Sequence, residues 1–271
     1  MTCNKLLLAF IIGFSLIGSG CSSSSDDSTA TPGLPADAVT ITTANAQPIA
    51  ISAVSTIGTV AVALGVDSGL PKIQNAINAI TDLAFNNNKD KNTFSVATGI
   101  TETDYCSPGD PTSGTYSDTW TETGDSSAGT YSGTITFNSC RIGSITIIGS
   151  FTYNDTWTTD GSYTETGSGS LTIRDTQQTF TITLNATETG NYLTEAYSET
   201  LSYSVTGTSL GGFLVETSIP LTGTWSSGTD AGQLMITGAG GTRLRITILD
   251  TTTASYEFDN GSGTFVPQGT L

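Results

Sequence analysis

The chain has 271 residues, of which 24 are acidic, 8 are basic and none is histidine, so its formal net charge is −16. Nucleic-acid binding needs Lys and Arg against phosphates, and the same shortage of bases disfavours docking on anionic lipid through a basic patch. Without histidine the chain lacks the commonest general base and the commonest transition-metal ligand. We therefore expect no nucleic-acid partner, no cofactor and no metal.

The first twenty residues have the pattern of a secretory signal peptide. Lys5 precedes a mostly apolar run over residues 6–17, and residues 18–20 are small. The next residue is Cys21, and here the segment resembles a bacterial lipoprotein signal, in which the cysteine after the cut is lipidated. The apolar run is too short for a comfortable membrane span. We expect residues 1–20 to be removed and Cys21 to carry lipid; ordinary secretion and an uncleaved anchor are the alternatives.

Residues 21–40 are predicted to form a flexible, lipidated tether. The stretch after Cys21 is polar and acidic, and Pro and Gly residues follow it. Each buried acyl carbon contributes about 0.8 kcal/mol, so a multiply acylated N-terminus holds a soluble domain on a bilayer. Ser22, directly after the cysteine, resembles the sorting pattern of outer-membrane lipoproteins. The expected location is the bacterial cell envelope, lipid-anchored in the outer membrane, on its periplasmic or its surface side.

The chain has four cysteines. Cys3 leaves with the signal peptide and Cys21 takes the lipid, so Cys106 and Cys140 remain. An even pair in an oxidising compartment predicts a disulfide, with two reduced buried thiols as the alternative. Two cysteines without histidine disfavour a zinc site.

Residues 41–92 are predicted to form a helical hairpin. Pro48 lies near the first turn of the first helix and Gly65 supplies its end. Isoleucines recur at near-helical spacing over residues 71–85, which predicts the second helix. The uncharged stretch 48–66 has the length of a membrane span, but its hydroxyl residues and lack of flanking bases favour a helix buried in its own protein.

From residue 93 to 271 the apolar period changes to two, with apolar residues alternating mostly with threonine. The runs and turns predict about 11 or 12 strands in antiparallel sheet with one wet face. Short connections, such as those at residues 239–241 and Asn260-Gly261, favour up-and-down order. We expect a mainly β fold: long antiparallel up-and-down strands in a curved sheet or barrel, with the helical hairpin packed on or inside it.

One further pattern alternates aromatic and acidic residues along single strands. Period two places each set on one face of the sheet; the sets comprise Tyr116, Asp118, Trp120 and Glu122, then Tyr153, Asp155 and Trp157, then Tyr163 and Glu165, and Tyr197 and Glu199. Such a face can stack sugars, hold a cation or, with two carboxylates, hydrolyse a glycosidic bond. The alternative is strand ends where aromatics meet solvent and acids keep the sheet soluble. We assign no catalytic residue, because no Gly-x-Ser-x-Gly motif and no activating histidine occur.

The C-terminal stretch resembles the end of a group of uncharacterised proteobacterial secreted proteins and lipoproteins with a threonine-rich β domain. The matching pieces are residues 41–46 ("ITTANA"), the cysteine pair Cys106 and Cys140, and residues 232–242. The resemblance implies shared architecture and envelope location, but no activity. In that group the last turn often has the pattern of a calcium loop; here residues 259–263 hold a single carboxylate, which favours a plain hairpin turn.

The expected function is a non-catalytic structural or binding role in the envelope. The expected partner is a membrane, to which the N-terminal lipid attaches the protein. A carrier of lipid or another apolar ligand in a helix-lidded half barrel is the first alternative. A glycan-binding or glycan-cleaving protein and an outer-membrane pore are the others. The absence of a terminal aromatic residue disfavours the pore.

Overall fold

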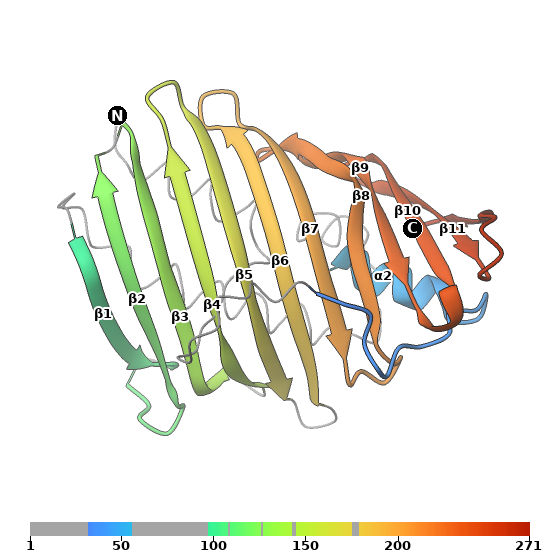
Figure 1. The fold of residues 1–271 in the computed structure, drawn as a ribbon, viewed down its shortest axis with the longest axis horizontal. Coiled ribbons are helices and arrows are strands. Elements are labelled where there is room, and N and C mark those ends of the chain that lie inside the picture. The colour runs from blue at the N-terminus through green and yellow to red at the C-terminus, as the bar shows by residue number, and fades with distance from the viewer. Residues whose placement is uncertain (1–31, 56–96, 108, 126, 143–144, 175–178) are drawn as a thin grey trace.

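The computed structural model describes residues 32–55, 97–107, 109–125, 127–142, 145–174 and 179–271. Twelve strands in these ranges form one antiparallel sheet, in which every strand pairs with the next one along the chain (Figure 1). The sheet curves but does not close, and β1 and β12 lie at its two opposite edges. The predicted mainly β class and up-and-down order are therefore confirmed, and of the two predicted shapes the structure has the curved sheet rather than the barrel.

The strands are longest in the middle of the sheet and shorten towards β12. Their bounds are β1 (Ala97–Tyr105), β2 (Thr115–Gly124), β3 (Gly129–Ile142), β4 (Ile145–Trp157), β5 (Ser162–Arg174), β6 (Thr179–Asn191), β7 (Ala196–Thr206), β8 (Phe213–Thr224), β9 (Gly228–Thr237), β10 (Arg243–Asp250), β11 (Thr253–Asp259) and β12 (Val266–Thr270). A single 3-10 turn, η1 (Ala239–Gly241), joins β9 to β10 at the position predicted for a hairpin.

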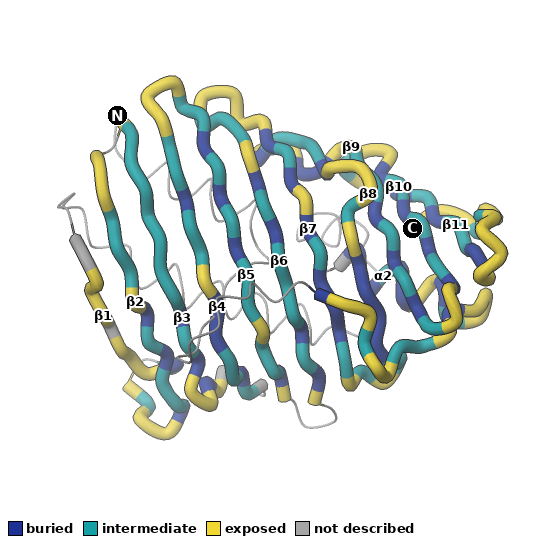
Figure 2. Tube along the Cα trace, in the orientation of Figure 1, coloured by how far each residue is buried: buried dark blue, intermediate teal, exposed yellow. Residues whose placement is uncertain are grey.

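Alternation along the strands divides the sheet into two faces. We call the face that carries the buried apolar side chains the inner face; buried positions alternate with more exposed ones along most strands (Figure 2). The outer face over β2–β7 consists largely of Ser, Thr and Asn, and some of its Ser and Thr hydroxyls bond across strands, as Thr172 and Thr181 do at 3.0 Å. β-branched threonine suits such a surface because it packs on the pleat while its hydroxyl stays wet.

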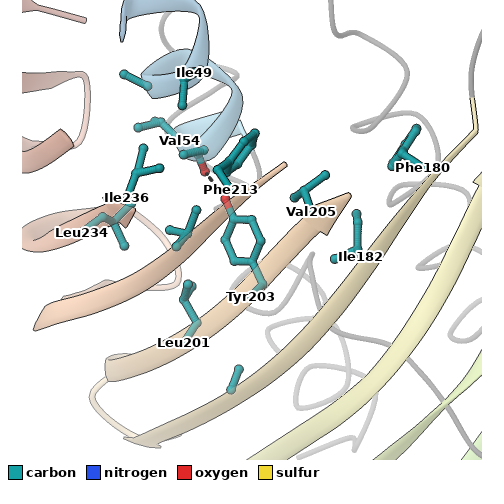
Figure 3. Close-up of a cluster of buried hydrophobic side chains, with 14 of the residues drawn as sticks. Ile49, Val54, Phe180, Ile182, Leu201, Tyr203, Val205, Phe213, Leu234 and Ile236 are labelled. Carbon is teal, nitrogen blue, oxygen red and sulfur yellow. Dashed lines mark hydrogen bonds between the residues drawn. The ribbon is translucent and has the colours of Figure 1, made fainter. Parts of the chain in front are cut away.

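The helix α2 (Ala46–Ser55) packs against the inner face near β7–β10 (Figure 3). Asn45 precedes it, and its side-chain oxygen accepts a hydrogen bond from the Thr42 amide at 2.7 Å, which holds the turn that starts the helix. Ile49 and Val54 are at most 1% exposed, and the Tyr203 hydroxyl donates to the Ala53 carbonyl at 3.2 Å. The first predicted helix is confirmed over these ten residues.

Several predictions concern residues outside the described ranges. These are the signal peptide (1–20), Cys21, the second helix of the hairpin and most of the uncharged stretch 48–66. Within the described ranges, no helix has the length and apolarity needed to cross a membrane.

The last part of the predicted tether is bound to the sheet. The Val39 amide donates to Gly212 at 2.8 Å, and the Val39 carbonyl accepts from the Ala239 amide at 2.7 Å. Asp37 also accepts a hydrogen bond from the Gly207 amide at 2.7 Å. Any flexible tether therefore ends before Asp37 rather than at residue 40.

The predicted disulfide between Cys106 and Cys140 is present, with a Cα–Cα distance of 5.4 Å. Cys106 follows β1 and Cys140 lies in β3, so the bond ties the β1–β2 connection to the sheet two strands away. Both residues are at most 3% exposed. The bond thus reinforces the β1 edge of the sheet, where β1 pairs with β2 alone.

Candidate functional site

Strand register brings acidic residues from four neighbouring strands into one line across the inner face. The members lie directly opposite one another in turn: Asp155 of β4, Glu165 of β5, Glu188 of β6 and Glu199 of β7. We call these four residues the carboxylate row. On the β3 side the line continues with Tyr131 and then Glu122, and on the β8 side with Leu221.

The neighbouring line of the inner face, two residues away on each strand, holds the aromatic residues Trp157, Tyr163 and Tyr197, with Gly190 between the two tyrosines. There Trp157 of β4 lies opposite Tyr163 of β5. Tyr163 also packs against two residues from the connections that follow β6 and β8, and we call Tyr163, Tyr192 and Trp225 the aromatic cluster. Its ring centroids are 4.6 Å apart for the stacked tyrosines and 5.3–5.4 Å apart for the two pairs with Trp225. These separations are those of favourable aromatic contacts, so the cluster forms a packed unit beside the row.

Tyrosine hydroxyls donate hydrogen bonds to acids of the inner face. Tyr163 donates to Oε1 of Glu188. Tyr153 donates to Oδ1 of Asp118 at 3.0 Å, in a second group further towards β2. Burial raises the pKa of both tyrosines far above the ordinary value, so both hydroxyls keep their protons.

Glycines leave room for these rings on the adjoining strands. Gly133 lies opposite Tyr153, and a Cβ on it would overlap the tyrosine hydroxyl and ring. Gly190 stands in the same relation to Tyr163. The sequence uses glycine inside strands here because a ring lies flat across the backbone of its neighbour.

The second aromatic group involves Trp120, Tyr131 and Tyr153. The Trp120 and Tyr131 rings have centroids 5.5 Å apart, and Tyr131 stacks on Tyr153 at 5.2 Å. Together with the Tyr153–Asp118 hydrogen bond, this group repeats on β2–β4 the combination of ring stacking and tyrosine–carboxylate bonding found around Glu188.

The members of the row are buried, not exposed at strand ends. Glu165 is 5% exposed, Glu188 2% and Glu199 3%. The interpretation of these acids as solubilising, solvent-facing groups is therefore wrong, because the same period that aligns them turns their side chains towards the core. Burial raises the pKa of Asp155 and of Glu188 to about 7 and that of Glu199 to about 8, and burial with the neighbouring Glu188 raises the pKa of Glu165 far above the ordinary value.

All eleven residues predicted from the alternating pattern lie on the inner face, but they do not form one site. Tyr116 and Asp118 lie near the start of β2, beside the apolar core and away from the carboxylate row. Trp157 is half-buried and its indole N–H donates to the Asp125 carbonyl at 2.8 Å. Tyr197 is buried next to the aromatic cluster and shares a hydrogen bond with Thr229 at 2.7 Å.

Residue-by-residue reasoning missed Glu188, Tyr192 and Trp225. Glu188 has threonines on both sides and no aromatic two residues away, so the alternating pattern does not include it. A signal was present nevertheless: the apolar set Phe180, Ile182, Leu184 and Ala186, extended by one more period of two, reaches Glu188. Tyr192 and Trp225 follow strand ends, where no periodic pattern applies.

The carboxylate of Asp259, at the end of β11, accepts its hydrogen bonds from groups of the protein itself. Oδ1 of Asp259 accepts hydrogen bonds from the Gly261 and Gly263 amides at 3.0 and 2.9 Å, while Oδ2 accepts from the Arg243 guanidinium at 2.7 Å. Asp259 therefore holds the loop as a hairpin turn.

Chemically, the inner face offers buried acids and tyrosine hydroxyls in contact with one another. Over the part of the chain that the structure describes, no three His, Cys, Asp or Glu side chains converge in a way that could hold a metal ion. No family model, curated protein or solved structure matches this chain. The assignment of a function consequently rests on the sequence signals and on this geometry.

Proposed function

We propose that the protein is a lipid-anchored component of the bacterial cell envelope, attached to the outer membrane through Cys21, with a non-catalytic structural or binding role. The lipoprotein-like signal supports the anchor and the compartment. The Cys106–Cys140 disulfide supports an oxidising environment, since such bonds are rare in the cytosol of ordinary bacteria.

The observation that carries the non-catalytic role is the way the inner-face polar groups bind one another. Tyr163 donates to Glu188 and Tyr153 to Asp118, while the rings around them stack on each other. A glycosidase needs two carboxyl groups that flank and touch the scissile bond of the sugar. Here the acids are enclosed by aromatic rings and neighbouring strands, which favours a role in building the inner face.

A second candidate function, a carrier of lipid or another apolar ligand, is favoured by the open shape and the apolar inner face of the sheet. Phe137, Phe151 and Phe180 from β3, β4 and β6 are each 1% exposed and add large apolar area to that face. A carrier would yield the full chain with stoichiometric lipid when it is purified without added lipid and analysed by native mass spectrometry. Finding only the covalently attached acyl chains would remove this candidate.

The anchor is tested by growing a bacterial host that expresses the full chain with an alkyne-tagged fatty acid. Wild type should take up the label and fractionate with outer membranes. Cys21→Ala should lose both properties, whereas the matched variant Cys3→Ala should keep them, because Cys3 leaves with the signal peptide. Labelled Cys21→Ala protein in the membrane fraction would contradict the proposal.

A further inference from the structure

The carboxylate row is unusual because its four acids lie side by side without a cation among the described residues. The four arginines of those ranges are engaged or positioned elsewhere. Arg243 and Arg245 pair with Asp259 and Glu257 at 2.7 and 2.6 Å. Arg141 lies 3.8 Å from Asp110, and Arg174 ends β5, nine residues beyond Glu165.

Four like charges directly opposite one another would destabilise the sheet. Adjacent antiparallel strands lie about 4.8 Å apart, and like charges facing across them repel even at the surface. In this row burial is nearly complete, which strengthens the repulsion because water no longer screens it. Fully ionised acids are therefore incompatible with the observed packing.

Two oxygen atoms of the row have no hydrogen-bond partner. Oδ1 of Asp155 and Oε2 of Glu188 are each buried without one in the described part of the chain, although their residues are only 9% and 2% exposed. A buried acceptor without a donor costs free energy, so such an atom needs a hydrogen, a water molecule or an ion as its partner. A protonated carboxyl supplies that hydrogen, since its O–H donates while its other oxygen still accepts.

We propose that the carboxylate row is held together by shared protons instead of counter-ions, and that it is a pH-sensitive switch for the packing of the inner face. In the protonated state each acid O–H donates to a neighbouring carboxyl oxygen across the strands. On ionisation the protons pass to solvent, the acids repel one another, and water must enter to solvate them. This inference does not depend on the membrane anchor or on the nature of any ligand.

The described groups around the row contribute no positive charge. The described titratable groups that face it are Glu122 and Tyr131 on the β2–β3 side, Tyr163 and Tyr192 of the aromatic cluster, Tyr153 beside it on β4, and Tyr197 on β7. Tyr192 is close enough to Asp155, Glu165 and Glu188 for these acids, after burial, to raise its pKa. Burial raises the pKa of Tyr153, Tyr163, Tyr192 and Tyr197, so these tyrosines stay neutral donors while the acids change charge.

The direction of the pH effect follows from the raised pKa values. In the unfolded chain these acids have ordinary pKa values of 3.8 for Asp and 4.5 for Glu, whereas in the folded protein the pKa is about 7 for Asp155 and about 8 for Glu199. Between those limits the folded state holds protons that the unfolded state has lost, so the free energy of unfolding falls as pH rises. The stability from the row is full below the unfolded pKa values and is lost as the pH rises through the folded ones.

The aromatic cluster is the expected point of opening. Trp225 packs on Tyr163, whose hydroxyl is bonded to Glu188, so hydration of the row exposes the indole to water. Tryptophan emission then shifts to longer wavelength, and the shift reports the switch separately from global unfolding.

The test uses the full chain in detergent micelles, with Tm and tryptophan emission recorded from about pH 5 to about pH 8.5. Wild type should lose about 5 °C or more in Tm over this range, with a red shift of emission, since one pKa unit per acid is worth a few degrees in a chain of this size. Glu199→Gln and the double variant Glu165→Gln/Glu199→Gln should flatten the Tm profile progressively, because Gln has the shape of the protonated acid and cannot ionise. Glu216→Gln, which changes an exposed acid of β8, should retain the wild-type profile.

Three results would overturn the proposal. The first is a wild-type Tm that is constant or rises with pH. The second is a Glu199→Gln profile as steep as that of Glu216→Gln; the single variant decides the question if the double variant does not fold. The third is a Tm at fixed high pH that increases on adding Ca²⁺ and falls on chelation, which would assign the row to a metal cation.

Discussion

The hydroxyl of Tyr163 donates its hydrogen bond to Glu188 diagonally across the β5–β6 pair, while the ring of Tyr163 lies over Gly190. One residue thus donates to one oxygen of a buried acid, fills the space left by a glycine and stacks in the aromatic cluster. This relationship connects the two lines of the inner face, the acids and the aromatics.

Removing that hydroxyl should destabilise the protein. Tyr163→Phe keeps the ring and its packing but leaves Oε1 of Glu188 without its donor. The expected loss in the free energy of unfolding is about 1–3 kcal/mol, the cost of an unsatisfied buried group. Urea denaturation followed by circular dichroism measures it, with Tyr105→Phe as control because that side chain is 42% exposed. Equal stability of both variants would show that the bond contributes nothing.

Adding one methyl group at Gly133 should also be costly. In Gly133→Ala the new Cβ overlaps the Tyr153 hydroxyl and approaches the Thr119 carbonyl oxygen to 2.7 Å, so the ring or the strands must move. We expect a loss of about 1–3 kcal/mol, as for other overpacked cores. Gly33→Ala is the matched control, since its Cβ would meet nothing within 4 Å. A Gly133→Ala variant as stable as the control would mean that the ring packing is readily rearranged.

The disulfide should contribute substantially to stability. Cys106 and Cys140 are 34 residues apart, and the chain-entropy relation gives about 4 kcal/mol for a loop of this length. Replacing both cysteines by alanine should lower the free energy of unfolding by roughly that amount under oxidising conditions. The reduced wild type should match the double variant. No difference between oxidised wild type and the double variant would show that the unfolded chain is not restrained by the bond.

Sequence patterns predicted much of the fold. The period of two and the short turns between strands were sufficient for the antiparallel up-and-down order, because these signals are local. The sequence did not decide between an open curved sheet and a closed barrel, because closure depends on the summed twist and stagger of many strands. The docking of residues 37–41 was also missed. Residues 37–40 directly follow the polar, proline-containing stretch that has the composition of a tether, and the hydrogen bonds of Asp37 and Ile41 are to partners about 170 to 200 residues away.

The candidate site was predicted only as a set of residues sharing a face. Period two placed Asp155 with Trp157 and Glu199 with Tyr197, and the structure agrees. Which acid lies opposite which depends on register, and register depends on turn lengths and bulges that composition does not reveal. The burial of the acids contradicts the usual preference of carboxylates for solvent, so the solubilising interpretation was the natural one and was wrong.

The most direct test of the protonated row is carbon-13 NMR of the side-chain carboxyl carbons, titrated in the folded full chain and assigned with Glu199→Gln. The account predicts that Glu199 is still protonated at about pH 7 and loses its proton near the pKa of about 8, whereas the pKa of the partly exposed Asp110 is lowered by a hydrogen bond from Thr112, so that this acid is already ionised at about pH 7. A Glu199 signal that is already fully ionised at about pH 5 in the folded protein would contradict the account.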